Sequence, residues 1–587
     1  MCGIIGYKGQ KDAVKIVLNG LKRLEYRGYD SWGIAVKDGN IRTAKEVGKI
    51  GAVSYDDLKL GASNMAMAHT RWATHGEVNE FNAHPHLSND KKIAVVHNGI
   101  IENYAELKNF LKNDGFEFFS GTDTEVIPNL IEHFLHEGYG FKKAIFETLN
   151  RLKGNYAVVI FHQDFPFLVG ARKGSPLVVG KNTEGFFIAS DVPAFLDLTN
   201  EVCYMDDGEA VFVDENLEFF DLEKNKLEKK FEFIDWTIEQ AQKGNYNHFM
   251  LKEIIEQKET IRKSIEQDDE KLKEMAKLIN EAKGTFFVAC GTASYATRVG
   301  GYLFSKMAKK HVNVVCGSEF ANYKHFLTPE TLMVVVSQSG ETADTIEAVK
   351  AAKEKGVKVL SIVNVMGSTL MRMADHSFLT NAGPEIGVAS TKATTAQIAV
   401  LMLLAYGCDG RLEEGKDVLD RCIEESQYIF EDKFLKIIEN LADKIVGYND
   451  IYVIGRGTNF PVALEAAHKI KEVSYIHAEG MAGGELKHGT IALIDKGTPC
   501  IVLVSNDECK GDIINNAMEI KSRGGFIIGI GPEDNETFDY FIKVPDINGA
   551  SSIVNLIPAQ MLAYYLAVKR NCDPDKPRNL AKSVTVK

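Results

Sequence analysis

A cysteine directly follows the initiator methionine, in the opening stretch MCGIIGY. A small second residue permits removal of that methionine, and Cys2 would then carry a thiol and a free α-amine on one residue. The α-amine titrates near pKa ~7.7–8.0, so it is suited to take the proton from the thiol. The alternative is that Cys2 is a small apolar residue entering a strand, because GIIGY is typical of a strand.

A second chemical pattern is the stretch SQSGETADT, which follows an apolar run and precedes a predicted helix near Ala343. Gly340 lets the backbone approach a ligand closely. Hydroxyls at a helix N-terminus suit phosphate. The stretch lacks the lysine of a nucleotide-binding P-loop, so we expect neither a triphosphate nor Mg²⁺ here. The alternative is a helix cap made by Ser339 and Thr342. The candidate phosphate ligands are Ser337, Gln338, Ser339 and Thr342.

The chain contains this arrangement twice. Gly291-Thr292 precedes the first turn, and Gly457-Thr458 precedes a second turn, SNDECKGD, at nearly equal spacing. Such paired anchors indicate a duplicated α/β domain. In the second copy Asp507 and Glu508 stand at the turn and would repel phosphate, so we expect phosphate at the first copy only.

A third pattern gathers titratable groups near the end of the chain. Lys469 and Glu472 are spaced i, i+3 on a predicted helix and share a face, although a plain surface ion pair is the commoner case. The Gly-flanked stretch GGELKHG contributes another titratable group, His488. We expect the terminal PRNLAKSVTVK to dock and to bring Lys582 to a specific place. A lysine amine forms a Schiff base with a sugar ketone, and a carboxylate can then move a proton between carbons.

The surrounding sequence predicts the elements that must position these groups. Residues 1–230 are rich in short strand signals, with helices expected at 11–24, 124–138 and 141–152, which is typical of antiparallel sheets covered by helices. A charged, helical stretch follows, and after it predicted strands alternate with predicted helices in a βαβ pattern. The predicted segments after the first domain are a linker with leading helices (231–283), two copies of an α/β domain (284–410 and 445–570) and a docking tail (571–587).

Composition sets limits on the class of protein. The 587 residues predict about three or four domains, and 45% apolar with 25% charged residues is ordinary for a globular chain. The net charge of −13 argues against a nucleic-acid partner. We see no signal peptide and no stretch of ~20 uncharged apolar residues, which argues against a membrane span. Nine scattered cysteines without a CxxC pair suggest a reducing cytoplasm.

Together these motifs resemble one family along essentially the whole chain. The matching stretches are MCGIIGY, LKRLEYRGYDSWGIAV, HTRWATHG, HNGIIENY, TDTEV, SQSGETADT, EIGVASTKA, KEVSYIHAEG, GELKHG and PRNLAKSVTV. They resemble the isomerising glutamine–fructose-6-phosphate aminotransferases, also called glucosamine-6-phosphate synthases. The resemblance implies an N-terminal-nucleophile glutaminase, an α+β αββα sandwich, followed by two α/β sugar isomerase domains with parallel sheets. It implies no metal and no cofactor.

The resemblance also assigns roles in the glutaminase. Cys2 would attack the glutamine amide, and its own α-amine would shuttle the proton. Asn98 and Gly99 would form the oxyanion hole, while Arg71 and Asp123 would bind the carboxylate and ammonium of glutamine. The other positions matched near this site are Arg27, Trp72, Thr74 and His75, of which Trp72 would gate an ammonia channel.

In the sugar half, the resemblance places the phosphate on Thr292 and on the turn 337–342. Lys582 would form the imine, Glu472 would shift the proton and Lys469 would assist. His488 would help to open the sugar ring and would come from the other subunit of a homodimer. Further sugar contacts would come from Val388 and Ser390. One departure is Ala293 where the family commonly has serine, and a local shift could let Ser294 substitute.

The implied reaction converts fructose 6-phosphate and glutamine into glucosamine 6-phosphate and glutamate, the first step of amino-sugar biosynthesis. Three alternatives share parts of this pattern: a deglycase, a sugar-phosphate-sensing regulator and an amidotransferase for phosphoribosyl pyrophosphate. Deglycases usually lack the glutaminase, the regulators carry a helix-turn-helix module, and the third class has a different C-terminal domain. Cys2 with its partners and the duplicated domain argue against all three.

Overall fold

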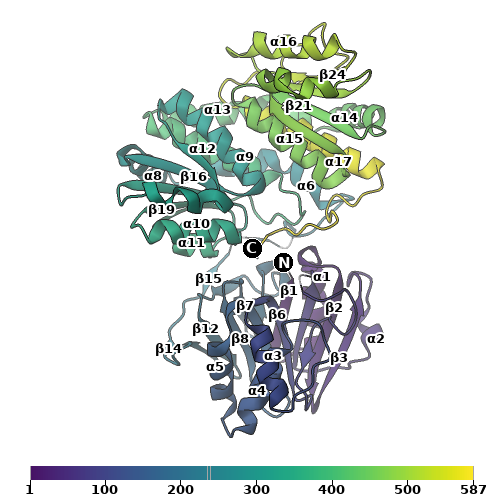
Figure 1. Ribbon diagram of the computed structural model, residues 1–587, viewed down its shortest axis with the longest axis vertical. Helices are drawn as coiled ribbons and strands as arrows, with labels where there is room; N and C mark the ends of the chain where they lie inside the picture. Colours follow the sequence, from purple (N-terminus) through teal and green to yellow (C-terminus); the bar gives the residue numbers. More distant parts are fainter. Residues whose placement is uncertain (1, 74, 235, 238, 586–587) are drawn as a thin grey trace. The chain divides into compact units, whose positions relative to one another are not determined.

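The structure is a computed structural model that describes residues 2–73, 75–234, 236–237 and 239–585. It divides into two compact units. The first unit comprises Met1–Gln242 together with Ala581–Lys587, and the second comprises Lys243–Leu580 (Figure 1).

Two antiparallel sheets form the centre of the first unit. The strands of the larger sheet are β1 (Gly3–Gly9), β2 (Ser31–Asp38), β3 (Asn40–Val47), β4 (Met65–Arg71), β9 (Val178–Asn182), β10 (Gly185–Ala189), β11 (Glu201–Tyr204) and β15 (Glu232–Phe233). Those of the smaller sheet are β5 (His86–Leu87), β6 (Ile93–Ile101), β7 (Gly154–His162), β8 (Leu168–Lys173), β12 (Glu209–Val213), β13 (Leu217–Asp221) and β14 (Lys226–Leu227). Their orders are β15-β11-β9-β10-β1-β4-β2-β3 and β14-β13-β12-β8-β7-β6-β5.

Helices cover the outer faces of these sheets. Side chains such as Met67 and Val159 fill the space between the sheets. Helix α1 (Ala13–Arg23) packs on β1 and β4, and a short α2 (Tyr55–Leu58) lies beside it. Helices α3 (Tyr104–Asn113), α4 (Val126–His136) and α5 (Phe141–Arg151) pack on the smaller sheet. The predicted αββα layering is therefore confirmed (Figure 1).

The second unit contains two parallel sheets. The first has strands β16 (Gly284–Ala289), β17 (Asn313–Cys316), β18 (Thr331–Ser337), β19 (Lys358–Val363) and β20 (His376–Leu379). The second has β21 (Asp450–Gly455), β22 (His477–Ala482), β23 (Pro499–Leu503), β24 (Phe526–Gly531) and β25 (Tyr540–Lys543). Their orders, β17-β16-β18-β19-β20 and β22-β21-β23-β24-β25, share one topology, in which the second strand of each copy lies at the edge beside the first.

The helices that follow equivalent strands also correspond. Helix α9 (Gly291–Leu303) follows β16, and α15 (Asn459–Ser474) follows β21. The glycines that begin these turns, Gly291 and Gly457, have φ of +56° and +55°, a region that favours glycine. Helix α10 (Ala343–Lys353) follows the candidate phosphate turn of the first copy, and α16 (Lys510–Lys521) follows the matching turn of the second copy. The structure thus contains the duplicated α/β domain that the sequence predicts.

The charged stretch before β16 belongs to the core of the second unit. It forms α6 (Phe249–Ile255), α7 (Gln257–Ile265) and α8 (Asp269–Glu281), which pack apolar residues such as Met250 and Leu272 into the core shared by the two sheets. Helices α11 (Thr369–Met373), α12 (Lys392–Cys408), α13 (Leu412–Glu425), α14 (Asp432–Ile445) and α17 (Ser551–Lys569) complete the unit.

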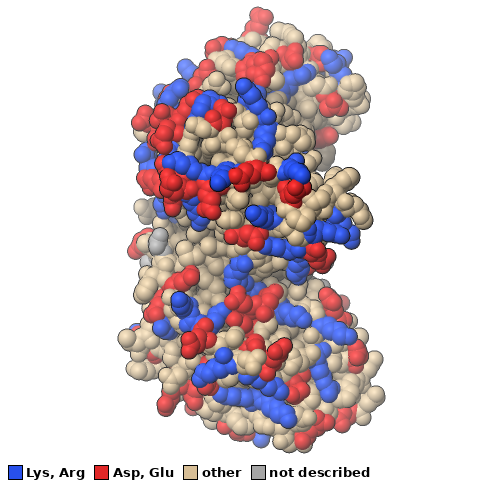
Figure 2. Space-filling model, turned by 90° about the vertical axis from the view of Figure 1, so that its left-hand side faces the viewer, with Lys and Arg blue, Asp and Glu red and all other residues tan. Residues whose placement is uncertain are grey.

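Helix α17 is long and apolar. Within the part of the chain that the structure describes, it alone has the length and hydropathy to cross a membrane, and 83% of its apolar window is buried in the protein. A core helix of a globular unit has the same properties. Figure 2 shows Lys and Arg side chains lying among Asp and Glu across the face that it draws.

Candidate active sites

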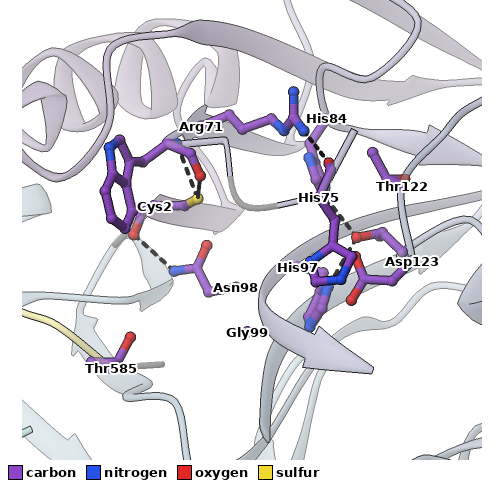
Figure 3. Close-up of a pocket in the computed structure, with 12 residues that line it drawn as sticks. Cys2, Arg71, His75, His84, His97, Asn98, Gly99, Thr122, Asp123 and Thr585 are labelled. Atoms are coloured by element: carbon purple, nitrogen blue, oxygen red, sulfur yellow. Dashed lines mark hydrogen bonds between the residues drawn. The ribbon is translucent and has the colours of Figure 1, made fainter. Parts of the chain in front are cut away.

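A pocket in the first unit surrounds Cys2 (Figure 3). Strand β1 pairs with β4 so that Gly3 lies opposite Thr70, which brings Cys2 next to Trp72 at the end of β4. The pocket has about 530 Å³ of free volume, part of it open to solvent. Its lining residues are Cys2, Arg71, Trp72, His75, His84, His97, Asn98, Gly99, Thr122, Asp123, Thr124 and Thr585.

A backbone N–H contacts the Cys2 thiol, and two side chains hold the Cys2 carbonyl. The Trp72 N–H donates to Cys2 Sγ at 3.2 Å, and the Cys2 carbonyl accepts from Asn98 Nδ2 at 2.8 Å and from Arg27 Nε at 3.3 Å. Burial raises the pKa of the Cys2 thiol, although the Trp72 N–H and the charges of Arg71 and Arg27 oppose this effect. A buried thiol of this kind requires a base before it can act as a nucleophile.

Arg27 has a structural partner of its own. Its Nη1 donates to Asp191 Oδ2 at 2.6 Å, and the hydroxyl of Tyr26 donates to the same oxygen at 2.6 Å. The guanidinium is buried, so the pair fixes its direction. Arg27 therefore orients the backbone of Cys2.

Asn98 and Gly99 lie near the end of β6, as an oxyanion hole beside Cys2 requires. Gly99 has φ of +124°, and a Cβ built there would lie 2.0 Å from the Asn155 carbonyl oxygen. No other residue fits this backbone, which explains glycine at this position.

The predicted glutamine ligands lie on the opposite side of the pocket. The Arg71 guanidinium donates to the carbonyl oxygens of Gly76 (2.9 Å) and Glu77 (3.1 Å), and also to that of His75. Asp123 Oδ2 accepts from the Ile101 N–H at 2.7 Å. Arg71 is thus tied to the 75–77 loop, and Asp123 to β6. Thr74, also predicted here, lies outside the described residues.

Four buried histidines pack around this pocket, and two of them, His84 and His97, line it. Each is buried, and burial lowers the pKa of each, to about 3 for His69, so the rings are neutral at neutral pH. They are His69, His84, His86 and His97. Among the described residues, no group of three or more His, Cys, Asp or Glu is arranged to hold a metal ion.

The predicted phosphate turn lies between β18 and α10 in the second unit. Ser337 Oγ accepts from the Gly340 N–H at 3.0 Å and lies 3.5 Å from Thr342 Oγ1. Gly340 has φ of +67°, and a Cβ there would lie 2.1 Å from Ser368 Oγ. The close approach and the positive φ both require glycine.

The capping interpretation of this turn is wrong in its detail. Thr342 is the N-cap of α10, yet its side chain makes no capping hydrogen bond, and Ser339 Oγ accepts from the Glu341 N–H at 3.2 Å within the turn. Gln338 contributes its carbonyl oxygen to the Asn364 N–H at 3.1 Å. The Thr342 hydroxyl is therefore not used to cap the helix.

A buried acid–base cluster lies on one face of α15. Lys469 forms an ion pair with Glu472, and its Nζ lies 3.6 Å from Glu465 Oε1. Burial raises the pKa of Glu465 to about 7, despite the favourable charge of Lys469. Burial alone would lower the pKa of Lys469, but the carboxylates outweigh it and the pKa is raised. Burial lowers the pKa of the neighbouring His468 to about 4.

Glu465 is a functional candidate that the sequence reasoning missed. It lies four residues before Lys469, so an i, i+4 search from that lysine would have placed it on the same face. The Thr292 side chain, from α9 of the first copy, interacts with the Glu465 carboxylate and lowers its pKa, which partly opposes the effect of burial. The cluster thus brings together groups from both copies of the domain.

The remaining sugar-site candidates lie on separate segments. Ser390 Oγ donates to Glu385 Oε2 at 2.9 Å, and the Val388 N–H donates to the Asp575 carbonyl at 3.0 Å. Ala293 is buried, and Ser294 Oγ lies 3.7 Å from Cys316 Sγ, so that hydroxyl faces β17.

The catalytic candidates near the chain end divide between the units. Residues up to Leu580 belong to the second unit, where the Arg578 N–H donates to the Tyr475 hydroxyl at 2.7 Å. Lys582 groups with the first unit, in which Thr585 lines the Cys2 pocket. His488 is exposed at the end of a 3₁₀ segment (Gly483–His488).

The turn SNDECKGD of the second copy differs in charge from the turn at 337–342 of the first copy. Lys306, just after α9, lies 2.7 Å from Glu508 Oε1 and 3.7 Å from Asp507 Oδ2. The acidic turn that the sequence predicts to repel phosphate therefore holds a lysine of the chain itself.

Comparisons with known proteins agree with a first domain followed by a duplicated α/β domain. Residues 69–197 match the glutamine amidotransferase domain family, and residues 278–406 and 444–570 match the SIS domain family. Fold and site thus define a class in which a glutamine amidotransferase domain is joined to two SIS domains. The chain is 43% identical to the glutamine–fructose-6-phosphate aminotransferase [isomerizing] of Clostridium acetobutylicum and 44% identical to that of Methanothermobacter thermautotrophicus, each over 100% of both chains.

A solved structure resembles the second half of the chain. It is the C-terminal domain of glucosamine-fructose-6-phosphate aminotransferase from Francisella tularensis, 33% identical, with a TM-score of 0.54 over 57% of this chain and 100% of that one. The chain belongs to the family of isomerising glutamine–fructose-6-phosphate aminotransferases.

Proposed function

We propose that the protein converts fructose 6-phosphate and glutamine into glucosamine 6-phosphate and glutamate. The observation that carries this proposal is the Cys2 pocket, where a thiol, an oxyanion-hole amide and an arginine–aspartate pair line one cavity. The hydroxyl-rich turn at 337–342 and the full-length similarity to named aminotransferases support the sugar half.

In the glutaminase step, the thiol of Cys2 attacks the side-chain carbonyl carbon of glutamine after the α-amine takes its proton. The carbonyl oxygen becomes an oxyanion that Asn98 and the Gly99 N–H stabilise. The C–N bond then breaks, the α-ammonium returns a proton, and ammonia leaves. Water hydrolyses the thioester to glutamate and regenerates the thiol. Arg71 and Asp123 bind the two charged groups of glutamine.

In the sugar step, the turn 337–342 and Thr292 bind the phosphate. Lys582 forms an imine with C2 of the open-chain ketose and releases water, after His488 has helped to open the ring. Ammonia displaces the lysine at C2, and Glu472 moves a proton from C1 to C2 while Lys469 assists. The product is the 2-amino aldose 6-phosphate, which closes to its ring form.

The arrangement of the whole enzyme is part of this proposal. The domains are a glutaminase (1–230), linker helices (231–283), two isomerase domains (284–410 and 445–570) and a tail (571–587) that completes the sugar site. Ammonia passes through a channel gated by Trp72. The protein is a cytoplasmic homodimer in which each sugar site receives His488 from the other subunit, and it begins amino-sugar biosynthesis.

Removal of the thiol separates the two reactions. With glutamine and fructose 6-phosphate as substrates, Cys2→Ala should form neither glutamate nor amino sugar, yet it should still interconvert fructose and glucose 6-phosphates. Cys203→Ala, at a buried cysteine elsewhere in the first unit, is the matched control and should keep both activities. Mass spectrometry of active enzyme should find no initiator methionine. Glutamate formation by Cys2→Ala would overturn the proposal.

A further inference from the structure

The side-chain amide of Asn98 has a single orientation that its neighbours permit. Its Nδ2 lies 2.8 Å from the carbonyl oxygen of Cys2. A carbonyl oxygen only accepts hydrogen bonds, so the nitrogen, and not the oxygen, must face Cys2. That bond uses one of the two N–H groups on Nδ2 and leaves the other available in the pocket, which Asn98 lines.

His69 contacts the other end of the same amide. Its Nε2 lies 3.1 Å from Asn98 Oδ1 and 3.0 Å from the His97 carbonyl oxygen. Both of these atoms are acceptors, so Nε2 must carry the proton. The other ring nitrogen, Nδ1, is buried and has no hydrogen-bond partner among the described residues, as an unprotonated nitrogen can tolerate better than a donor.

The packing around His69 fixes its ring. The side chain is fully buried on β4, and its ring stacks on that of His84 with centroids 4.1 Å apart. His84 is itself held by a hydrogen bond of 2.9 Å between Nε2 and Thr124 Oγ1. Because burial lowers the pKa of His69 to about 3, the neutral tautomer with one donor persists throughout the neutral range.

We propose that His69 is a positioning residue of the glutaminase, whose Nε2–H holds the Asn98 amide with its nitrogen toward the oxyanion. The inference rests on the proposed role of Asn98 as an oxyanion donor. Without His69 only the Cys2 carbonyl would hold the amide in this orientation, and rotation by 180° would present its oxygen to the developing negative charge, which would repel that charge. His69 would then influence the rate without touching the substrate.

This role makes a specific kinetic prediction. Loss of one oxyanion-hole donor lowers kcat by about 10²–10³-fold. Glutamine binding depends on Arg71 and Asp123, so KM should change little. The alkylation of Cys2 by iodoacetamide forms no oxyanion, and its rate should also be unchanged.

The test uses three variants of the full-length protein. His69→Leu removes the donor, and its kcat for glutamine hydrolysis should fall about 10²-fold with KM within threefold of wild type. His69→Gln retains an N–H near the Nε2 position and should recover at least tenfold of that loss. The matched control is His162→Leu, at another buried histidine in the first unit, which should retain kcat. Sugar isomerisation checks that each variant is folded.

A double variant decides between positioning and a general structural effect. If His69 acts through Asn98 alone, His69→Leu should lower the kcat of Asn98→Ala by less than twofold. Multiplicative losses, a raised KM, slower Cys2 alkylation or no recovery in His69→Gln would overturn the inference. If Asn98→Ala itself retains wild-type kcat, the proposed oxyanion hole fails first, and the role of His69 fails with it.

Discussion

The ionisation of Glu465 makes the stability of the second unit depend on pH. Its carboxyl is 1% exposed, and burial raises its pKa from 4.5 to about 7. The folded protein therefore binds more protons than the unfolded chain between these two values. The stability contributed by the protonated form is complete below pH 4.5 and is lost as the pH rises through 7. One pKa unit corresponds to about 1.4 kcal/mol, so the loss between pH 5 and 8 is about 2–3 kcal/mol.

Glu465→Gln should abolish this dependence, because the amide resembles the protonated acid and does not ionise. We expect the variant to match wild type near pH 5 and to exceed its free energy of unfolding by about 2–3 kcal/mol at pH 8. The assay is urea unfolding followed by far-UV circular dichroism. All three tryptophans precede residue 243, so their fluorescence reports the first unit and identifies its transition separately.

The control is Glu413→Gln, since the Glu413 side chain is 77% exposed and should leave the pH dependence as in wild type. Two results would refute the reasoning. One is a Glu465→Gln protein with the pH slope of wild type, and the other is a variant less stable than wild type at pH 8. Either would mean that Lys469 stabilises the charged carboxylate more than burial opposes it.

Three further predictions concern the reactions. Ser339→Ala or Thr342→Ala should raise the KM for fructose 6-phosphate more than it lowers kcat, because each lost charge-assisted hydrogen bond is worth about 1.5–3 kcal/mol of binding; unchanged KM values in steady-state assays would place the phosphate elsewhere. Gly99→Ala should abolish glutamine hydrolysis, whereas Gly115→Ala, also at positive φ but with no atom within 4 Å of the added carbon, should keep it. Lys582→Arg should lose synthesis but still bind sugar phosphate, since a guanidinium is a poor nucleophile. In wild type, borohydride reduction should attach the sugar to a peptide containing Lys582. Attachment to another lysine would argue against an imine at Lys582.

The sequence predicts the layers of this protein well because its signals there are local. Alternating strands and the helices at 11–24, 124–138 and 141–152 are visible in one stretch of chain, and the structure has α1, α4 and α5 at these places. The duplication is visible too, because Gly291 and Gly457 each need a positive φ at the same step after a strand.

Groups whose role depends on distant neighbours were not predictable in this way. Glu465 is an ordinary helix residue until packing buries it beside Lys469 and the Thr292 side chain from the other copy. His69 is one residue of a strand until the pairing of the sheets brings it to Asn98. The sequence could not decide how the Ser339 and Thr342 hydroxyls are used, because the same groups can cap a helix or face a ligand. Thr342 is the N-cap of α10, but its side chain makes no capping hydrogen bond.

The two copies of the α/β domain carry different groups at matching positions. In the second copy, Glu472 on α15 forms an ion pair with the buried Lys469. The matching position of the first copy, just after α9, is Lys306, which pairs with the acidic turn of the second copy. The hydroxyl-rich turn thus lies in the first copy, and the buried cluster around Lys469 lies in the second. Under the proposed function the two copies supply different parts of one sugar site, so a substitution in either copy should alter the same reaction.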